Sequence, residues 1–505
     1  MHFYTLIWLI LLQLLATNLS AQTTIVNASK GRSCATDLYQ DALEQLQPGI
    51  KLEQQQAKEA AQLYLSQRKK AGKEMRQAGP ITIPVVFHVL YNTADQNISD
   101  EQIFSQLAVL NADFRRTNAD RINTPSHFAA IAGDAGIEFC LASTDPNGNL
   151  TNGITRTQTT TRSFSVTSNN IKRQDKGGVT GWDRDQYLNI WVGNIDDDIL
   201  GWATFPGVNS SAQNDGVVLH YQTVGTAPFN KANWQYNKGR TATHEIGHWL
   251  GLQHIWGNGN ASCSDSDDID DTPNQYDANY SCPDGAMVSC GNGPTGDMWQ
   301  NYMDYTDDDC MNMFTNGQIA YMQSILSTSR SKLLVSVACN GGLRADFEAE
   351  TNTLIQAKEA IQFKDKSVGV KPTTRLWEFE GGVPATSTEI NPKVTYKKPG
   401  KYKVTLTIGN SQTSSTETKT QYIEVTPNEL TIYPVPAADY LMIEQPANVE
   451  LRKVEVLDRV GRVWLTQEVF NRTAELKTKG LPAGVYVLRI TGSKGVETRK
   501  ITIVR

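Results

Sequence analysis

The stretch that decides the fold is residues 244–254, which read His-Glu-Ile-Gly-His-Trp-Leu-Gly-Leu-Gln-His. His244 and His248 are four positions apart, so on a helix both rings project from one face and reach the same point. Gly251 supplies the left-handed residue that ends a helix, and the chain can then turn back to bring His254 to the first two histidines. Three imidazoles with one coordination position left open are typical of a catalytic zinc site.

Glu245 stands next to the first of these histidines. Zinc lowers the pKa of a bound water to about 7, so a carboxylate at this place can take its proton and pass it to a leaving amine. A single histidine in a protein usually has a packing role. Three histidines at this spacing beside a glutamate favour a hydrolytic zinc site instead, with Glu245 as the general base.

Length and composition limit what surrounds this motif. A chain of 505 residues predicts three or four domains. The 47 basic and 53 acidic residues give a net charge of -6, which excludes the basic surface of a nucleic-acid-binding protein. The apolar run 6–16 is shorter than the roughly 20 residues of a spanning helix, so we expect no transmembrane segment. With the small residues that follow, it predicts a secretory signal peptide over residues 1–21.

Residues 22–79 are polar and predict a helix near 52–65, followed by the basic run 68–70. We interpret this part as a prosegment with a cleavable basic end, and the alternative is an ordinary helical linker. Residues 80–340 mix β-rich runs with a helix and predict an α/β (α+β) catalytic domain. The expected elements are strands over 81–90, 188–192 and 216–220, and a helix over 99–114 that Ser99 caps.

Beyond residue 345 the helical pattern ends. Short β-rich runs separated by Gly-, Pro- and Asn-containing turns predict two all-β immunoglobulin-like sandwich modules, over residues 345–426 and 430–505. The clearest strands of these modules are 402–408, 430–433, 454–457 and 485–490.

The motif 244–254 resembles the extended zinc motif of the metzincin proteases. Residues 301–315, Asn-Tyr-Met-Asp-Tyr-Thr-Asp-Asp-Asp-Cys-Met-Asn-Met-Phe-Thr, are similar to the methionine turn of the pappalysin family within that class. Residues 83–91 and 109–117 resemble the family's opening strand and helix. The resemblance covers about 80–340 and implies a zinc endopeptidase acting on protein substrates. Met303 would form the apolar base of the site, and Tyr305 would stabilise the oxyanion.

The same resemblance implies a specificity pocket. In pappalysins an acidic residue gives a preference for Arg or Lys after the cut bond, and Asp308 matches it in position. A buried carboxylate favours a cationic side chain and leaves an unpaired charge opposite others. The alternative is a solvated aspartate within the run Asp307–Asp309.

The loop between His254 and Met303 is poor in apolar residues and requires other stabilisation. Its four cysteines allow three connectivities, and the resemblance implies the pairs Cys263–Cys290 and Cys282–Cys310. Residues 265–271 hold five carboxylates in seven positions, which suits calcium. The family's calcium site in this loop would correspond to ligands among Asp267, Asp268 and Thr272; a solvated acidic loop is the alternative.

Cys34 lies in the expected prosegment, within Arg-Ser-Cys-Ala at 32–35. A thiolate is a good zinc ligand, so Cys34 could block the open position and keep the enzyme latent until cleavage. The competing reading pairs Cys34 with Cys140 or Cys339 in a disulfide. If Cys34 is the zinc ligand, Cys140 and Cys339 are left to pair with each other.

The two β modules carry resemblances of their own. Residues 377–384 and 396–402 resemble a polycystic-kidney-disease (PKD) domain. Residues 433–436, 484–486 and 500–505 resemble the C-terminal sorting domain of the type IX secretion system, which implies export by that machinery to the outside or outer surface of a Gram-negative bacterium. The rival to a latent zinc protease is a surface adhesion protein whose metzincin domain is inactive.

Overall fold

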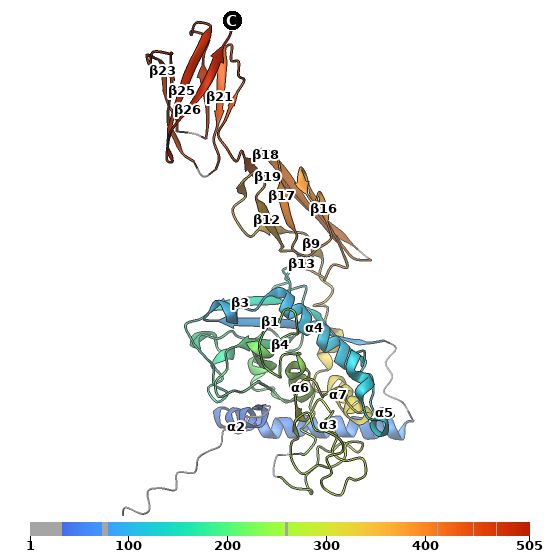
Figure 1. Ribbon diagram of the computed structural model, residues 1–505. Coiled ribbons are helices and arrows are strands. Elements are labelled where there is room, and N and C mark those ends of the chain that lie inside the picture. Colours follow the sequence, from blue (N-terminus) through green and yellow to red (C-terminus); the bar gives the residue numbers. More distant parts are fainter. Residues whose placement is uncertain (1–32, 73–78, 258–260, 412, 448, 471) are drawn as a thin grey trace, which may run out of the picture. The chain divides into compact units, whose positions relative to one another are not determined.

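The computed structural model describes residues 33–72, 79–257, 261–411, 413–447, 449–470 and 472–505 (Figure 1). The predicted signal peptide lies outside these residues. The chain forms two compact units. The first contains most of the chain up to residue 335, and the second contains residues 140–154, residues 336–505 and a short part of the first strand.

A six-stranded sheet organises the first unit. Five of its strands lie in the order β2-β1-β4-β6-β5, and the sixth strand, β3, also pairs with β1. The central strand β4 is buried at all six positions, as its apolar sequence predicts. The strands are β1 (Ile81–Tyr91), β2 (Ile137–Leu141), β3 (Ile154–Gln158), β4 (Leu188–Gly193), β5 (Gly201–Ala203) and β6 (Val217–His220).

The strand at one end of this sheet, β5, lies next to helix α6, which carries the first two histidines of the zinc motif. β5 pairs antiparallel with β6, while β6 pairs parallel with β4. β5 contains only three residues, and its partner on the other side is a segment near Cys34 that pairs with Gly201 in parallel. The edge of the sheet is therefore covered by the N-terminal part of the chain.

Three helices of eight residues or more pack around this sheet within residues 79–335. Helix α4 (Asp100–Phe114) begins where the sequence predicts, because the Ser99 hydroxyl accepts the backbone N–H of Gln102 at 3.2 Å. Helix α6 (Arg240–Trp249) packs against α4, β5 and β6. Helix α7 (Asn316–Ser327) follows the methionine turn, and α5 (Ser126–Ala129) is a single turn.

Two further helices form the N-terminal part of the unit. They are α2 (Thr36–Leu46) and α3 (Ile50–Lys70), which lie one after the other below the sheet in Figure 1. α2 packs against β5 and α3 against α7. The basic run 68–70 forms the last turn of α3. Apolar side chains of α2 join a buried cluster with residues of the sheet, so this segment is docked on the unit as a folded layer.

The second unit holds two β modules, each with its own buried core. The first module contains sheets of order β10-β12-β17-β15 and β11-β19-β18-β14-β16, and the pair β9-β13. Its strands are β9 (Leu343–Arg344), β10 (Phe347–Ala349), β11 (Leu354–Gln356), β12 (Ala360–Asp365), β13 (Val368–Gly369), β14 (Thr374–Phe379), β15 (Gly382–Val383), β16 (Thr386–Ser387), β17 (Lys393–Tyr396), β18 (Gly400–Gly409) and β19 (Ser414–Thr426).

The last module is a sandwich of two sheets, of order β20-β21-β24 and β23-β22-β25-β26. Its strands are β20 (Thr431–Tyr433), β21 (Tyr440–Glu444), β22 (Leu451–Leu457), β23 (Val463–Glu468), β24 (Thr473–Lys477), β25 (Gly484–Gly492) and β26 (Gly495–Ile503). None of the helices in the described part of the chain has the length and apolar character needed to cross a lipid bilayer.

Candidate metal centre

Helix α6 delivers the first two histidines and then ends abruptly. Gly251 has a φ of 91°, in the left-handed region, and the backbone N–H of Leu252 returns to the Gly247 carbonyl at 3.0 Å. A Cβ at Gly251 would lie 3.0 Å from side-chain atoms of Tyr321 and Ile325 on α7. The turn needs glycine for both reasons, and it directs the chain back so that His254 reaches the histidines of α6.

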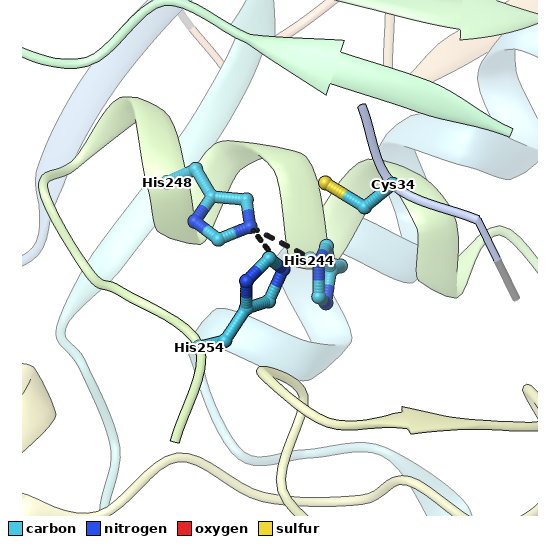
Figure 2. Close-up of side chains that lie close together, drawn as sticks. All are labelled: Cys34, His244, His248 and His254. Carbon is cyan, nitrogen blue, oxygen red and sulfur yellow. Dashed lines mark hydrogen bonds between the residues drawn. The ribbon is translucent and has the colours of Figure 1, made fainter. Parts of the chain in front are cut away.

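The three imidazoles converge on one point (Figure 2). Nε2 of His248 lies 3.1 Å from Nε2 of His244 and 3.1 Å from Nε2 of His254. With the Cys34 thiol, these side chains offer four ligand atoms that lie within 4.8 Å of one another. All three histidines are at most 3% exposed.

Backbone carbonyls fix the tautomer of two of these rings. Nδ1 of His244 donates to the Tyr302 carbonyl at 2.7 Å, and Nδ1 of His248 donates to the Leu252 carbonyl at 2.8 Å. In these two rings Nε2 is therefore the atom that carries the lone pair able to bind a metal. Burial, and next the neighbouring His254, lower the pKa of His248 to about 3, so this ring stays neutral. Converging neutral nitrogen donors with oriented rings fit a zinc ion.

Met303 and Tyr305, the predicted base of the site and the predicted oxyanion donor, both lie close to the histidines. Met303 is fully buried, and a Cβ at Gly247 of α6 would lie 2.4 Å from its sulfur. β8 (Tyr305–Thr306) carries Tyr305, whose ring centre lies 4.9 Å from that of His254. The Tyr305 hydroxyl donates to the Cys34 carbonyl at 3.3 Å. Burial raises the Tyr305 pKa well above its usual value, so the phenol stays protonated.

The residues around Cys34 contact Glu245 directly. The Thr36 hydroxyl donates to Glu245 Oε2 at 2.9 Å, and the Cys34 thiol lies 3.5 Å from the same oxygen. Burial, and next the Glu245 carboxylate, raise the pKa of Cys34 well above its usual value. A thiolate is therefore unfavourable here unless a cation offsets its charge.

The same segment occupies the edge of the sheet. The Leu200 N–H donates to the Ser33 carbonyl and the Ala35 N–H to the Gly201 carbonyl, both at 3.0 Å. The Ala203 N–H donates to the Thr36 hydroxyl at 2.9 Å. This hydroxyl thus bridges the edge strand and Glu245. Sequence reasoning missed Thr36, because a threonine two residues after a cysteine carries no recognisable signal.

Asp308 is buried at the start of α6, only 1% exposed. Its Oδ2 accepts the backbone N–H groups of Lys238 at 2.9 Å and Arg240 at 3.2 Å. This arrangement stabilises the N-terminus of the helix. The reading of Asp308 as a solvated aspartate is therefore wrong, and its neighbour Asp309 is the exposed member that pairs with Lys238.

The loop between His254 and Met303 is held by two disulfides, Cys263–Cys290 and Cys282–Cys310. It also contains the short strand β7 (Tyr280–Ser281), which pairs with β8. In the second unit Cys140 pairs with Cys339. Cys34 is the one cysteine outside a disulfide among the described residues, so the alternative in which it forms a disulfide does not hold.

The predicted calcium ligands are only partly together. Oδ1 of Asp267 accepts the Thr272 hydroxyl at 2.7 Å, whereas its buried Oδ2 has no hydrogen-bond partner among the described residues. Burial raises the Asp267 pKa to about 7, which marks a carboxylate lacking a compensating charge. Asp268 instead pairs with Lys58 of α3 at 2.5 Å. Of the three residues, Asp267 and Thr272 are therefore in direct contact with each other.

Comparisons with family models divide the chain in three. Residues 172–327 match the model described as pregnancy-associated plasma protein-A, a peptidase family. Residues 345–425 match a PKD domain, and residues 431–504 match a secretion system C-terminal sorting domain.

Known proteins give matching results. An extracellular metalloprotease of Arthroderma otae is 32% identical over 246 residues, which are 47% of this chain and 75% of that protein. An extracellular metalloprotease of Pyricularia oryzae is 32% identical over 261 residues, 50% of this chain and 77% of that protein.

The chain is also similar to solved structures of a mature protease and of its precursor. Mature mirolysin of Tannerella forsythia, solved with a cleaved peptide, is 52% identical, with a TM-score of 0.51, over 52% of this chain and 98% of that one. A promirolysin variant of the same organism is 46% identical, with a TM-score of 0.54, over 61% of this chain and 99% of that one.

The fold, the site and these likenesses define a secreted metalloprotease that is made as a zymogen. The chain belongs to the pregnancy-associated plasma protein-A family, the pappalysins, and it carries a PKD domain and a sorting domain of the type IX secretion system behind the protease.

Proposed function

We propose that this chain is a zinc endopeptidase that cuts protein substrates before Arg or Lys and is held latent by its own residues 22–79. The observation that carries the proposal is the convergence of three Nε2 atoms beside Glu245, at a point that Cys34 also reaches. His244, His248 and His254 would hold the zinc ion. When bound, zinc would supply a polarised water and a positive charge near the peptide carbonyl.

The remaining steps belong to this chain's side chains. Glu245, 1% exposed, takes a proton from the attacking water and returns it to the nitrogen of the leaving amine. The phenol of Tyr305 donates a hydrogen bond to the carbonyl oxygen as negative charge develops there. Met303 keeps the base of the site apolar and packs against Gly247 between the two histidines of α6.

Asp308 would give the preference for Arg or Lys, and its place sets the direction of the substrate. The Asp308 N–H donates to the Gln235 carbonyl at 3.4 Å, and the ring of the preceding Trp234 lies 5.6 Å from that of His220. The His220 N–H in turn donates to the Leu200 carbonyl at 2.9 Å. The residue after the cut bond therefore lies toward Leu200, and the residues before it lie toward Ala203.

A substrate with this direction runs antiparallel to β5. The segment around Cys34 pairs with β5 in parallel, so its peptide groups run in the opposite sense. It places a thiol at the open zinc position, and the Thr36 hydroxyl engages the general base. Three features together account for latency: the segment runs opposite to a substrate, its thiol blocks the open zinc position, and its Thr36 hydroxyl occupies Glu245.

A calcium ion at Asp267, Asp268 and Thr272 would stabilise the loop. The buried, unpartnered Oδ2 of Asp267 supports this assignment. In the latent form Lys58 of α3 pairs with Asp268 and would compete with the calcium ion for that carboxylate. Removal of α3 would make the Asp268 carboxylate available to calcium.

The test is cleavage-site profiling of the processed protein on a peptide library, with and without a zinc chelator. We expect cuts before Arg or Lys that a chelator and Glu245→Ala both abolish. Asp308→Asn should reduce the preference for basic residues, whereas Asp309→Asn at the exposed neighbour should keep it. Zinc content of each variant shows whether the centre has survived the substitution.

Two results would change the proposal. Metal-dependent cleavage with another preference would keep the zinc protease and discard the role of Asp308. No metal-dependent cleavage by zinc-loaded, processed protein would favour the rival function, a surface adhesion protein with an inactive metzincin domain.

A further inference from the structure

A lysine is buried beneath helix α2 without a carboxylate in direct contact. Lys172 is 1% exposed, and its ammonium donates to the Asn214 carbonyl at 2.7 Å and to the Thr204 hydroxyl at 3.2 Å. Within the described residues no carboxylate forms an ion pair with its Nζ; the nearest acidic influence is Asp215, which itself pairs with Arg330 and Arg184. Burial lowers the Lys172 pKa well below its usual value. Burying an ammonium that no carboxylate contacts is costly, so its remaining polar contact matters for holding its charge.

That contact is with Tyr39 of α2. The Lys172 ammonium donates to the Tyr39 phenol oxygen at 3.0 Å and lies 4.4 Å from the centre of the same ring. The ammonium also lies over the ring of Trp191, whose centre is 4.9 Å away. The Tyr39 ring also packs on Trp202, with centres 6.0 Å apart. A phenol thus meets a cation at both its face and its hydroxyl.

A cavity of about 660 Å³ lies beside this contact. Its lining includes Lys172, Asn169 and Asn214 from the catalytic domain, and Leu43 and Leu46 from α2. One wall of the cavity therefore belongs to the segment that leaves on maturation. Its departure opens the cavity and removes Tyr39 from the ammonium.

The position of this cavity relative to the cut bond follows from β5. Cys34, at the zinc position, is bridged to Gly201, and Thr204 follows three residues later. At about 3.3 Å per extended residue, Thr204 lies about 10 Å along the edge strand. It lies on the Ala203 side, away from Leu200 and Asp308. A substrate would bring its third residue before the cut bond to this place.

We propose that the site vacated by Tyr39 is a substrate subsite that takes a tyrosine side chain about three residues before the cut bond, with Lys172 as its specificity-determining residue. This inference rests on the proposed protease function and deepens it. Phenylalanine fills the ring position but leaves the ammonium without its oxygen partner, and an aliphatic side chain lacks both contacts. A site built to hydrogen-bond a hydroxyl rejects the analogue that lacks it.

The experiment uses the processed, full-length enzyme and peptides with Arg after the cut bond. The third residue before the bond is Tyr, Phe, Glu or Ala, and kcat/KM is measured for each. We expect Tyr to exceed Phe by about ten-fold, the effect of one hydrogen bond to a charged group. In Lys172→Met the ratio of Tyr to Phe should fall to about one. Lys176→Met, exposed in the same segment, should keep the wild-type ratio.

Each other outcome is decisive. Equal rates for Tyr, Phe and Ala in the wild-type enzyme, at this position and its two neighbours, would overturn the subsite while leaving the protease intact. A preference for Glu over Tyr would overturn the assignment of a phenol. Failure to cut any peptide in a metal-dependent manner would overturn this inference together with the proposed function. The comparison of Tyr with Phe in the wild-type enzyme tests the proposal by itself. The test therefore remains valid even if the Lys172→Met variant does not fold.

Discussion

At the scale of residues, Thr36 is as well placed as Cys34 to keep the enzyme latent. Its hydroxyl donates to Glu245 and accepts from Ala203, so one oxygen engages both the proposed general base and the edge strand. The convergence of the three histidines was predictable, because metal ligation demands fixed residue types at fixed spacing. Thr36 was not, because its role depends on a contact across 209 residues of sequence.

Replacing Thr36 by valine keeps the shape of the side chain and removes the hydroxyl. A hydrogen bond to a charged group contributes about 1.5–3 kcal/mol, so we expect the zymogen to cleave a fluorogenic peptide about ten-fold faster or more at early times. Thr36→Ser retains the hydroxyl and should behave as wild type. Equal initial rates for the valine and serine variants would contradict the role assigned to Thr36.

His88 on β1 predicts a dependence of stability on pH. Its ring is fully buried between Thr155 and Asn189, and burial lowers its pKa to about 4 from its usual 6.5. The unfolded chain binds the proton first, so stability is full above pH 6.5 and falls as the pH drops toward 4. From pH 7 to pH 5 this group should cost about 2 kcal/mol.

Thermal melts of the purified zymogen between pH 7 and pH 5 measure this effect. The drop in Tm should be smaller in His88→Gln than in the wild type. His127→Gln, at an exposed position, serves as the matched control and should retain the wild-type drop. An unchanged drop in His88→Gln would show that His88 does not carry the effect.

At the scale of elements, the long strands and helices follow from sequence, and the short ones do not. β1, β4 and β6 and helix α4 lie within about a residue of the predicted ranges, because apolar runs and the Ser99 cap define them. β5 has three residues, too few to show any periodicity, although the proposed substrate path runs along it. α2 was missed because its helix is set by packing on β5 and the sheet.

The contact between α6 and the methionine turn predicts that a glycine-to-alanine change inside a helix lowers the stability of the protein instead of raising it. Alanine replacing glycine inside a helix normally stabilises it by about 1 kcal/mol. At Gly247 the added Cβ would lie 2.4 Å from the Met303 sulfur, so Gly247→Ala should be destabilising by about 2 kcal/mol and lower the Tm by several degrees.

Calorimetric melts of a double-mutant cycle test this contact. Gly247→Ala combined with Met303→Ala should cost less than the sum of the two single changes, because the shorter side chain leaves room for the methyl group. A higher Tm for Gly247→Ala alone, or strict additivity in the cycle, would contradict the packing described.

At the scale of the whole molecule, the chain combines a latent protease with two β modules that have separate cores. Their sandwich character was predictable, since regularly spaced β-rich runs and turns fix the class of fold without fixing strand pairing. The match of residues 431–504 to a sorting domain makes export a property of the last module.

A chain that lacks residues 430–505 should therefore fold its protease but fail to leave the producing cell. In a host with a type IX secretion system, extracellular activity should fall by at least about ten-fold, while zymogen accumulates inside the envelope. A chain without residues 345–426 provides the control and should still be exported. Equal extracellular activity of the two truncated chains would contradict this division of roles.

We propose that one zinc ion, held by His244, His248 and His254, is blocked by Cys34 until the prosegment leaves. X-ray absorption at the zinc edge tests it directly on purified zymogen, processed enzyme and a Cys34→Ala zymogen. We predict one zinc per chain, with three nitrogen neighbours throughout, and one sulfur neighbour only in the wild-type zymogen. A zymogen without zinc, or a wild-type zymogen whose zinc has no sulfur neighbour, would contradict the account.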